Sequence, residues 1–145
     1  MAEGDPRPRI LVSNRQDAPV DEAGLVAVAS ACLRGEGMNA CELSVSLVTE
    51  EEMAELHLRY AGEEGPTDVL SFPMDGVDED GVRLLGDVVI APAVAAANNP
   101  ADPAAELRLL LVHGILHLLG HDHEDERGRA EMWASQERYT GVRVP

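Results

Sequence analysis

The chain has 145 residues, 45% of them hydrophobic, which is enough for one globular domain with a substantial core, and we predict a single domain over residues 1–145. Acidic residues outnumber basic ones by 27 to 11, and the net charge is −16. This balance argues against a broad basic surface for nucleic acid, and aromatic residues at 3% leave little material for stacking on bases.

No run of residues approaches the ~20 apolar positions needed to span a bilayer, so we expect no membrane partner. The first six residues lack the basic and apolar regions of a signal peptide. Cys32 and Cys41 lie outside any CxxC pattern and are predicted to be reduced core residues. These features together predict a cytoplasmic protein.

The first half of the chain predicts alternating strands and helices. A short strand is expected at 10–12, an amphipathic helix over 21–34 that ends near Gly35, and a strand of alternating polarity over 43–47. Thr49 and Glu52 have the spacing of a capping box, which predicts a helix running through Tyr60.

The second half predicts a hairpin followed by a long helix. Strands are expected over 69–74 and 84–91, joined by an acidic turn at 75–81. The turn does not fit a calcium loop of the EF-hand type, because a glycine stands where the first ligand should be. Asp102 and Pro103 predict the start of a helix that runs to Leu119, and a last helix is expected over 124–139.

The helix ending at Leu119 is apolar on nearly all sides beyond Leu107, which predicts that it is buried. Two histidines, His113 and His117, lie on it. An imidazole without a partner is costly in a core, and binding to a metal would remove that cost.

Four of the five histidines fall within residues 113–123, and their spacing predicts a metal site. His113 and His117 share one helix face, ~6 Å of rise apart, whereas His121 would lie ~12 Å beyond His113, too far to reach the same ion. Gly120 can end the helix and let His123 turn back. We therefore predict one zinc ion per chain, bound by His113, His117 and His123, with water in the fourth position, as in catalytic zinc sites.

The same histidine spacing occurs in metzincin proteases, whose pattern is H-E-x-x-H-x-x-G-x-x-H. In those enzymes a glutamate after the first histidine is the general base. Here that position is Gly114, which disfavours a peptidase. A nucleobase deaminase is also disfavoured, because the H-x-E pattern is absent.

Three blocks of the sequence resemble the YbeY family of bacterial metal-dependent endoribonucleases. The first is the histidine segment, H-G-I-L-H-L-L-G-H-D-H at 113–123. The others are P-T-D-V-L-S-F-P at 66–73 and L-G-D-V-V-I at 85–90. The resemblance extends from about Leu43 to Trp133, most of the chain.

The resemblance implies an α/β (α+β) fold with a small mixed sheet packed with helices and a zinc site formed by the three histidines. It implies a single-strand-specific endoribonuclease acting on ribosomal RNA, at the 3′ end of the small-subunit RNA, and in ribosome quality control. The expected partners are the small ribosomal subunit, ribosomal proteins and an exonuclease, but not DNA. Many members carry an arginine where this chain has Ala61, so Arg59 is the candidate phosphate-binding catalytic residue.

Two mechanisms stay open on the sequence. Either water activated by zinc attacks the phosphorus, or the 2′-hydroxyl of the RNA attacks and the metal acts as the electrophile. The carboxylates that could orient a histidine are Asp68, Asp87 and Asp122. Two other functions also remain open, a ribosome-assembly factor with a structural zinc and a zinc peptidase or other hydrolase.

Overall fold

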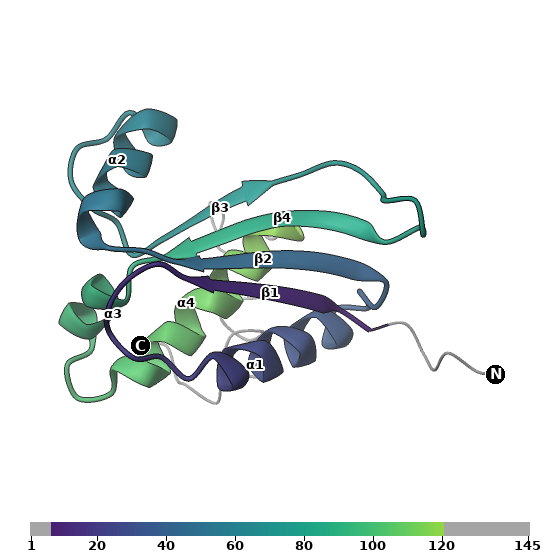
Figure 1. Cartoon of the computed structure of the whole chain (residues 1–145), viewed down its shortest axis with the longest axis horizontal. Helices are drawn as coiled ribbons and strands as arrows, with labels where there is room; N and C mark the ends of the chain where they lie inside the picture. The colour runs from purple at the N-terminus through teal and green to yellow at the C-terminus, as the bar shows by residue number, and fades with distance from the viewer. Residues whose placement is uncertain (1–6, 121–145) are drawn as a thin grey trace, which may run out of the picture.

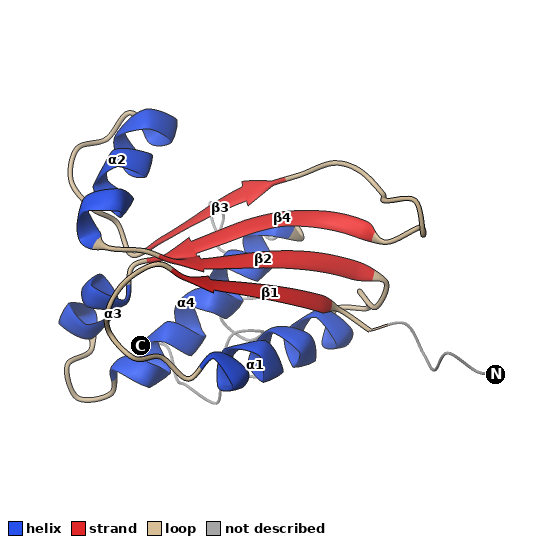
Figure 2. Ribbon diagram, in the orientation of Figure 1, coloured by secondary structure: helices blue, strands red, loops and turns tan. Residues whose placement is uncertain are grey.

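The computed structural model describes residues 7–120. His121, Asp122, His123 and the helix predicted over 124–139 lie outside the described residues. Figures 1 and 2 show the arrangement of the elements. In chain order these are β1 (Arg9–Asn14), α1 (Glu22–Gly35), β2 (Cys41–Leu47), α2 (Glu50–Ala61), β3 (Val69–Pro73), β4 (Arg83–Ile90), α3 (Pro92–Asn98) and α4 (Pro103–Leu118).

The four strands form one mixed sheet in the order β1-β2-β4-β3. Strands β1, β2 and β4 are parallel, and β3 pairs antiparallel with β4. Helices α1 and α4 lie together against one face of the sheet, while α2 stands at one end (Figure 1). The fold is therefore the expected α+β arrangement with a small mixed sheet and helices packed on it.

The two faces of the sheet pack against different helices. Val88 and Ile90 of β4 belong to the main core with α1 and α4, whereas Val89 and Ala91 pack with Met53 of α2. Because side chains alternate along a strand, the position of a residue in β4 decides which helix it meets. This alternation determines which polar residues can approach the histidines on α4.

Helices α2 and α4 begin at the predicted caps, and α1 begins at a cap that the sequence analysis does not predict. The side chains of Asp21, Thr49 and Asp102 each accept a hydrogen bond from a backbone N–H three residues later, at 3.0, 3.1 and 3.1 Å. The side chain of Glu52 forms an ion pair with Arg15 at 2.8 Å. The Thr49 half of the predicted capping box is thus confirmed, whereas the Glu52 carboxylate pairs with Arg15.

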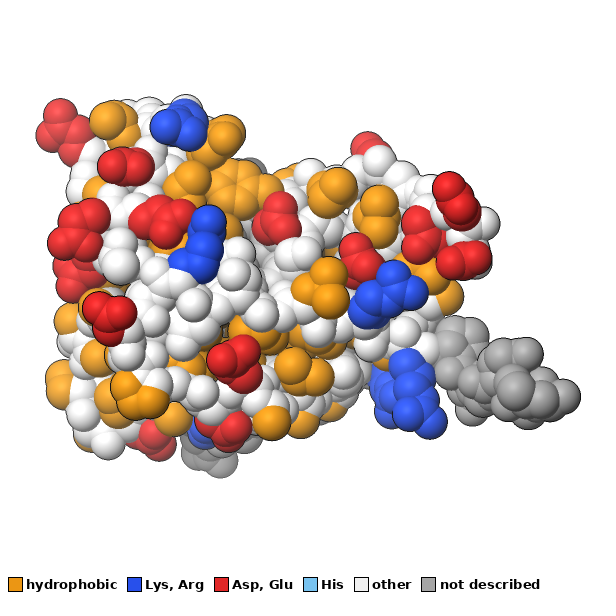
Figure 3. All heavy atoms as spheres, in the orientation of Figure 1, with side chains coloured by type: hydrophobic (Ala, Val, Ile, Leu, Met, Phe, Trp, Pro, Cys, Tyr) orange, Lys and Arg blue, Asp and Glu red, His pale blue; other side chains and the backbone are white. Residues whose placement is uncertain are grey.

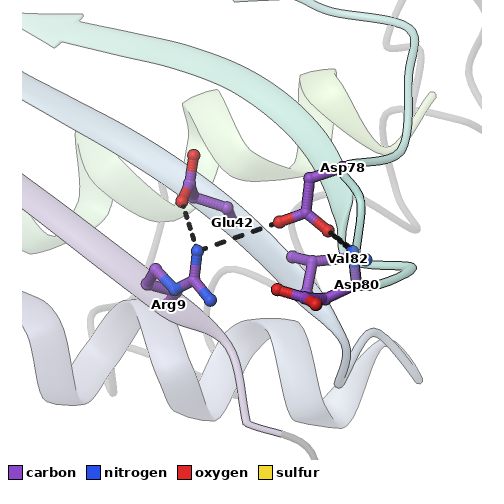
Figure 4. Close-up of polar contacts among 5 residues, drawn as sticks. All are labelled: Arg9, Glu42, Asp78, Asp80 and Val82. Atoms are coloured by element: carbon purple, nitrogen blue, oxygen red, sulfur yellow. Dashed lines mark hydrogen bonds and ion pairs between the residues drawn. The ribbon is translucent and has the colours of Figure 1, made fainter.

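The β3–β4 loop is a polar hairpin, as the sequence predicts (Figure 4). One carboxylate oxygen of Asp78 accepts hydrogen bonds from the backbone N–H groups of Asp80 and Val82, at 2.8 and 2.9 Å. Arg9 of β1 pairs with Glu42 at 2.9 Å and approaches Asp78 at 4.0 Å. These contacts hold the loop against the start of the sheet.

Two features of the fold are not predicted from the sequence. Helix α3 has seven residues and no side-chain cap, and the sequence analysis predicts neither a helix nor a strand in that segment. Strand β4 contains a bulge, because Glu42 pairs with Leu84 and Leu43 pairs with Gly86, so Leu85 is an extra residue.

Cys32 and Cys41 are buried and form no disulfide with each other, as expected for reduced core residues. Burial raises the pKa of the Cys41 thiol, and the nearby Arg83 charge opposes this shift. Over residues 7–120, no helix has the length and apolar composition to cross a membrane.

Candidate metal centre

Helix α4 carries His113 and His117 in its last two turns and packs on the sheet through buried residues, among them Leu111, Val112 and Ile115. His113 and His117 are half-buried. Their Nε2 atoms lie 3.1 Å apart, and the ring centroids lie 4.6 Å apart. The fold thus turns two imidazole nitrogens toward one point, as the spacing predicts.

This geometry fits a shared zinc ion. Two nitrogens that each lie ~2.05 Å from one tetrahedral zinc ion are separated by about 3.3 Å. The observed Nε2 separation is 3.1 Å, so only a small adjustment of the two rings is needed. Neutral imidazole nitrogens are also among the ligands that zinc prefers.

The third predicted ligand, His123, lies outside the described residues. Within residues 7–120, no group of three His, Cys, Asp or Glu side chains is placed to hold a metal. The structure does confirm the predicted end of the helix, because Gly120 has a φ of 93° and its N–H donates to the carbonyl of His117. The chain therefore leaves α4 directly after the histidine pair.

A hollow of about 360 Å³ lies beside the two histidines. Its other described walls are the edge strand β3 and the end of α4, and the residues that line it are Val69, Leu70, Ser71, Pro73, His113, His117 and Leu118. This volume lies in the range of small-molecule sites, and both imidazoles face it. Among the described residues, the histidine pair therefore faces a hollow on the side of β3.

Gly114 allows α4 to approach the sheet closely at this point. A Cβ at position 114 would lie 2.7 Å from a methyl carbon of Val88 and 3.1 Å from Oγ of Ser71. The Ser71 hydroxyl donates a 3.0 Å hydrogen bond to the carbonyl oxygen of Gly114. Strand β3 and helix α4 are thus joined one residue after His113.

The carboxylates suggested as partners of the histidines lie elsewhere. Asp87 pairs with Phe72 and precedes Val88, so it lies on the sheet face that packs with α2, opposite α4. Asp68 accepts a 3.2 Å hydrogen bond from Asn98 of α3. Asp87 is therefore not placed to orient a histidine of α4, and Asp68 contacts α3.

Arg59 lies on α2 and is exposed. Helix α2 packs through Met53 and Leu56 on the sheet face opposite α4. Its neighbour Tyr60 contacts Phe72 of β3 edge-to-face, with ring centroids 5.1 Å apart. Arg59 is not among the described residues that line the hollow, and its role as a phosphate-binding residue stays a prediction.

Sequence analysis did not identify Ser71 as a residue of the site. The available signal was a polar residue between apolar neighbours in the 69–74 strand, which reads equally well as an exposed position. Only the register with β4 shows that Ser71 stands opposite the buried Val88 and therefore faces α4.

Comparisons with known proteins agree with this architecture. A family model described as "Endoribonuclease YbeY" matches residues 11–141. A protein of that name from Frankia alni is 47% identical, over 89% of this chain and 79% of the relative. Another from Salinispora tropica is 44% identical, over 89% of this chain and 92% of the relative.

A solved structure is also similar. The solution structure of TM1509 from Thermotoga maritima superposes with a TM-score of 0.58 at 28% identity, covering 92% of this chain and 86% of that one. Since the family model and relatives above 40% identity both cover most of the sequence, the chain belongs to the YbeY endoribonuclease family.

Proposed function

We propose that this chain is a zinc-dependent, single-strand-specific endoribonuclease that acts in the cytoplasm on the 3′ end of small-subunit ribosomal RNA and in ribosome quality control. The observation that carries the proposal is the pair of Nε2 atoms, 3.1 Å apart, facing a hollow beside an edge strand. Family membership supplies the substrate class, since the relatives are named endoribonucleases.

His113, His117 and the predicted third ligand His123 would hold the metal. When bound, zinc in an open three-histidine site supplies Lewis-acid chemistry and activates water near neutral pH. The chain contributes the placement of the donors, because α4 fixes two of them one turn apart and Gly120 ends the helix where the third must return.

The contact between His113 and His117 also bears on protonation. One Nε2 must donate and the other accept in a 3.1 Å hydrogen bond, so at least one ring offers a lone pair in this geometry. A metal ligand needs that lone pair, and binding therefore competes with protons. A zinc ion bound by both Nε2 atoms would therefore replace the proton that lies between them.

Position 114 argues against the peptidase alternative. A glutamate there does not fit between α4 and the sheet, because a Cβ would already lie 2.7 Å from a methyl carbon of Val88. The general base of metzincins therefore has no equivalent at this position. RNA cleavage does not depend on that glutamate when the nucleophile is the 2′-hydroxyl.

The acidic surface limits how RNA is bound. On the face shown in Figure 3, acidic side chains are spread over α2, the strands and the β3–β4 loop. With a net charge of −16, long-range attraction to RNA is unfavourable. We propose that the small ribosomal subunit, ribosomal proteins and an exonuclease partner help to present the RNA to the hollow.

The test compares wild type, His117→Ala and His121→Ala. His121 is the matched control, since it lies in the same histidine segment and is not a predicted ligand. We expect about one zinc per chain and cleavage of single-stranded RNA for wild type and His121→Ala. We expect loss of both for His117→Ala, with its fold retained by circular dichroism.

Two outcomes separate the alternatives. Zinc bound without RNA cleavage by any of the three proteins would favour the assembly factor with a structural metal. Cleavage of peptides with RNA left intact would favour the peptidase. The ends of the RNA products then identify the nucleophile, because a 2′,3′-cyclic phosphate requires attack by the 2′-hydroxyl.

A further inference from the structure

The outer edge of β3 presents backbone groups to the hollow. Within the described sheet β3 has a neighbour on one side only, which is β4. The backbone hydrogen bonds from Ala91 to Asp68 and from Met74 to Leu85 continue the β3–β4 register at both ends. Asp68 and Met74 are both even-numbered, so the even-numbered residues of this segment are the ones whose backbone groups bond to β4.

In an antiparallel ladder, hydrogen-bonded and outward-facing residues alternate. The odd-numbered residues of β3 therefore direct their N–H and C=O groups away from β4. Val69 and Ser71 therefore point an N–H and a C=O outward, and Pro73 points a C=O outward. All three residues line the hollow that holds His113 and His117. The edge thus offers alternating donors and acceptors beside the candidate metal centre.

We infer that this edge binds the ribose–phosphate backbone of single-stranded RNA next to the bond that is cleaved, an inference that rests on the proposed function. The N–H groups of Val69 and Ser71 donate to phosphate oxygens. The outward C=O groups accept from 2′-hydroxyls. An RNA strand carries both partners in alternation along its backbone, whereas DNA lacks the hydroxyl donor.

The charge of the chain favours this arrangement over a basic clamp. Of the described residues that line the hollow, none is an arginine. Amide N–H groups bind phosphate without adding charge, as they do in other anion sites. Binding through them also releases few counterions, so the affinity should depend only weakly on salt.

The first test substitutes Val69 and measures RNA affinity. Val69→Pro removes one outward N–H and no ladder bond, and proline is tolerated at such edge positions. Val69→Ala is the matched control, because it loses the side chain and keeps the N–H. The zinc-loaded proteins are titrated with a fluorescent single-stranded RNA and the DNA of the same sequence, and the RNA is checked on a gel afterward.

We expect Val69→Pro to weaken binding about tenfold relative to Val69→Ala, for RNA and DNA alike, because phosphate is common to both. Wild type should bind RNA more tightly than DNA, and RNA methylated on the 2′-oxygens should bind like DNA. Equal affinity of the two variants, or unimpaired binding of the methylated RNA, would overturn the inference.

A second measurement needs no variant. Amide hydrogen exchange at Val69 and Ser71 in the wild-type protein, read by NMR, should slow when the RNA is added. Exchange that slows with an extended peptide but not with RNA would make the edge a peptide site and overturn the inference. RNA binding with these effects but without cleavage would refute the nuclease proposal alone.

Discussion

The hydroxyl of Ser71 donates a 3.0 Å hydrogen bond to the carbonyl oxygen of Gly114, and this contact joins the edge strand β3 to the helix that carries both histidines. The bond spans 43 positions of sequence and lies one residue from His113. It therefore fixes the histidine pair relative to the edge that forms the opposite wall of the hollow.

Ser71→Ala should lower the free energy of unfolding by about 1 kcal/mol, the usual value of a hydrogen bond between neutral groups. Zinc affinity should fall several-fold as well, because α4 loses a contact that positions His113. Urea unfolding and zinc titration check the two effects. The control is Ser46→Ala, a strand serine opposite Val89 on the other sheet face, and a loss of zinc affinity in that variant would argue against a local effect.

Gly86 is required by the bulge in β4. Its φ is 128°, and a Cβ would lie 2.1 Å from the carbonyl oxygen of Phe72. Gly86→Ala should therefore cost roughly 3 kcal/mol or more, through backbone strain and a clash with rigid backbone. A melting temperature equal to that of wild type would contradict this account.

The sequence predicts elements well where the signal is local. The caps at Thr49 and Asp102 identify two helix starts, because each requires only a side chain and an N–H three residues away. The end of α4 at Gly120 is local in the same way. The spacing of His113 and His117 follows from helix geometry alone, which is why the nitrogen pair could be predicted.

The remaining features depend on contacts between distant segments. Which face Asp87 occupies is decided by its pairing with Phe72 and by the bulge at Leu85. A one-residue change of register would move Asp87 to the histidine side, so no local pattern settles it. The role of Ser71 depends on the same register. Helix α3 was missed for a different reason, because seven residues are too few to show a helical periodicity.

Glu106 should make stability depend on pH. Burial raises the pKa of its carboxyl, the charge of Asp68 raises it further, and a hydrogen bond from Asn98 opposes both. The folded protein thus holds the proton more tightly than the unfolded chain. Stability therefore falls as the pH rises from the pKa of Glu106 in the unfolded chain to its raised pKa in the folded protein. Glu106→Gln should raise the melting temperature at neutral pH and leave it unchanged below the unfolded pKa.

Melting temperatures from pH 3 to pH 8 for wild type and Glu106→Gln test this sign. The matched variant is Asp68→Asn, which removes the charge that raises the pKa of Glu106 and should also flatten the wild-type profile. If Glu106→Gln is less stable than wild type at neutral pH, the ionised carboxylate is stabilising and the assignment fails.

Arg59 should affect RNA binding more than the chemical step. It is exposed on α2, on the sheet face opposite α4, so its charge can meet the RNA outside the hollow. Arg59→Ala should raise KM about fivefold, equivalent to roughly 1 kcal/mol, with kcat and the melting temperature little changed. A large fall in kcat would instead place the guanidinium at the reacting phosphate. Arg34→Ala, an arginine on α1, is the charge-matched control.

The effect of Gly114→Ala on the free energy of unfolding should change sign when Val88 is replaced by alanine. Alone, Gly114→Ala places a methyl 2.7 Å from a stiff, buried valine and should cost about 1–2 kcal/mol, even though alanine favours the helix by about 1 kcal/mol. In a Val88→Ala background the clash with Val88 is removed and only the 3.1 Å contact with Oγ of Ser71 remains, so the same substitution should stabilise the protein. A double-mutant cycle by urea unfolding measures this difference. Independent effects of the two substitutions would mean that helix and sheet can separate here, and the fixed distance between the histidines and the β3 edge would no longer be a property of the fold.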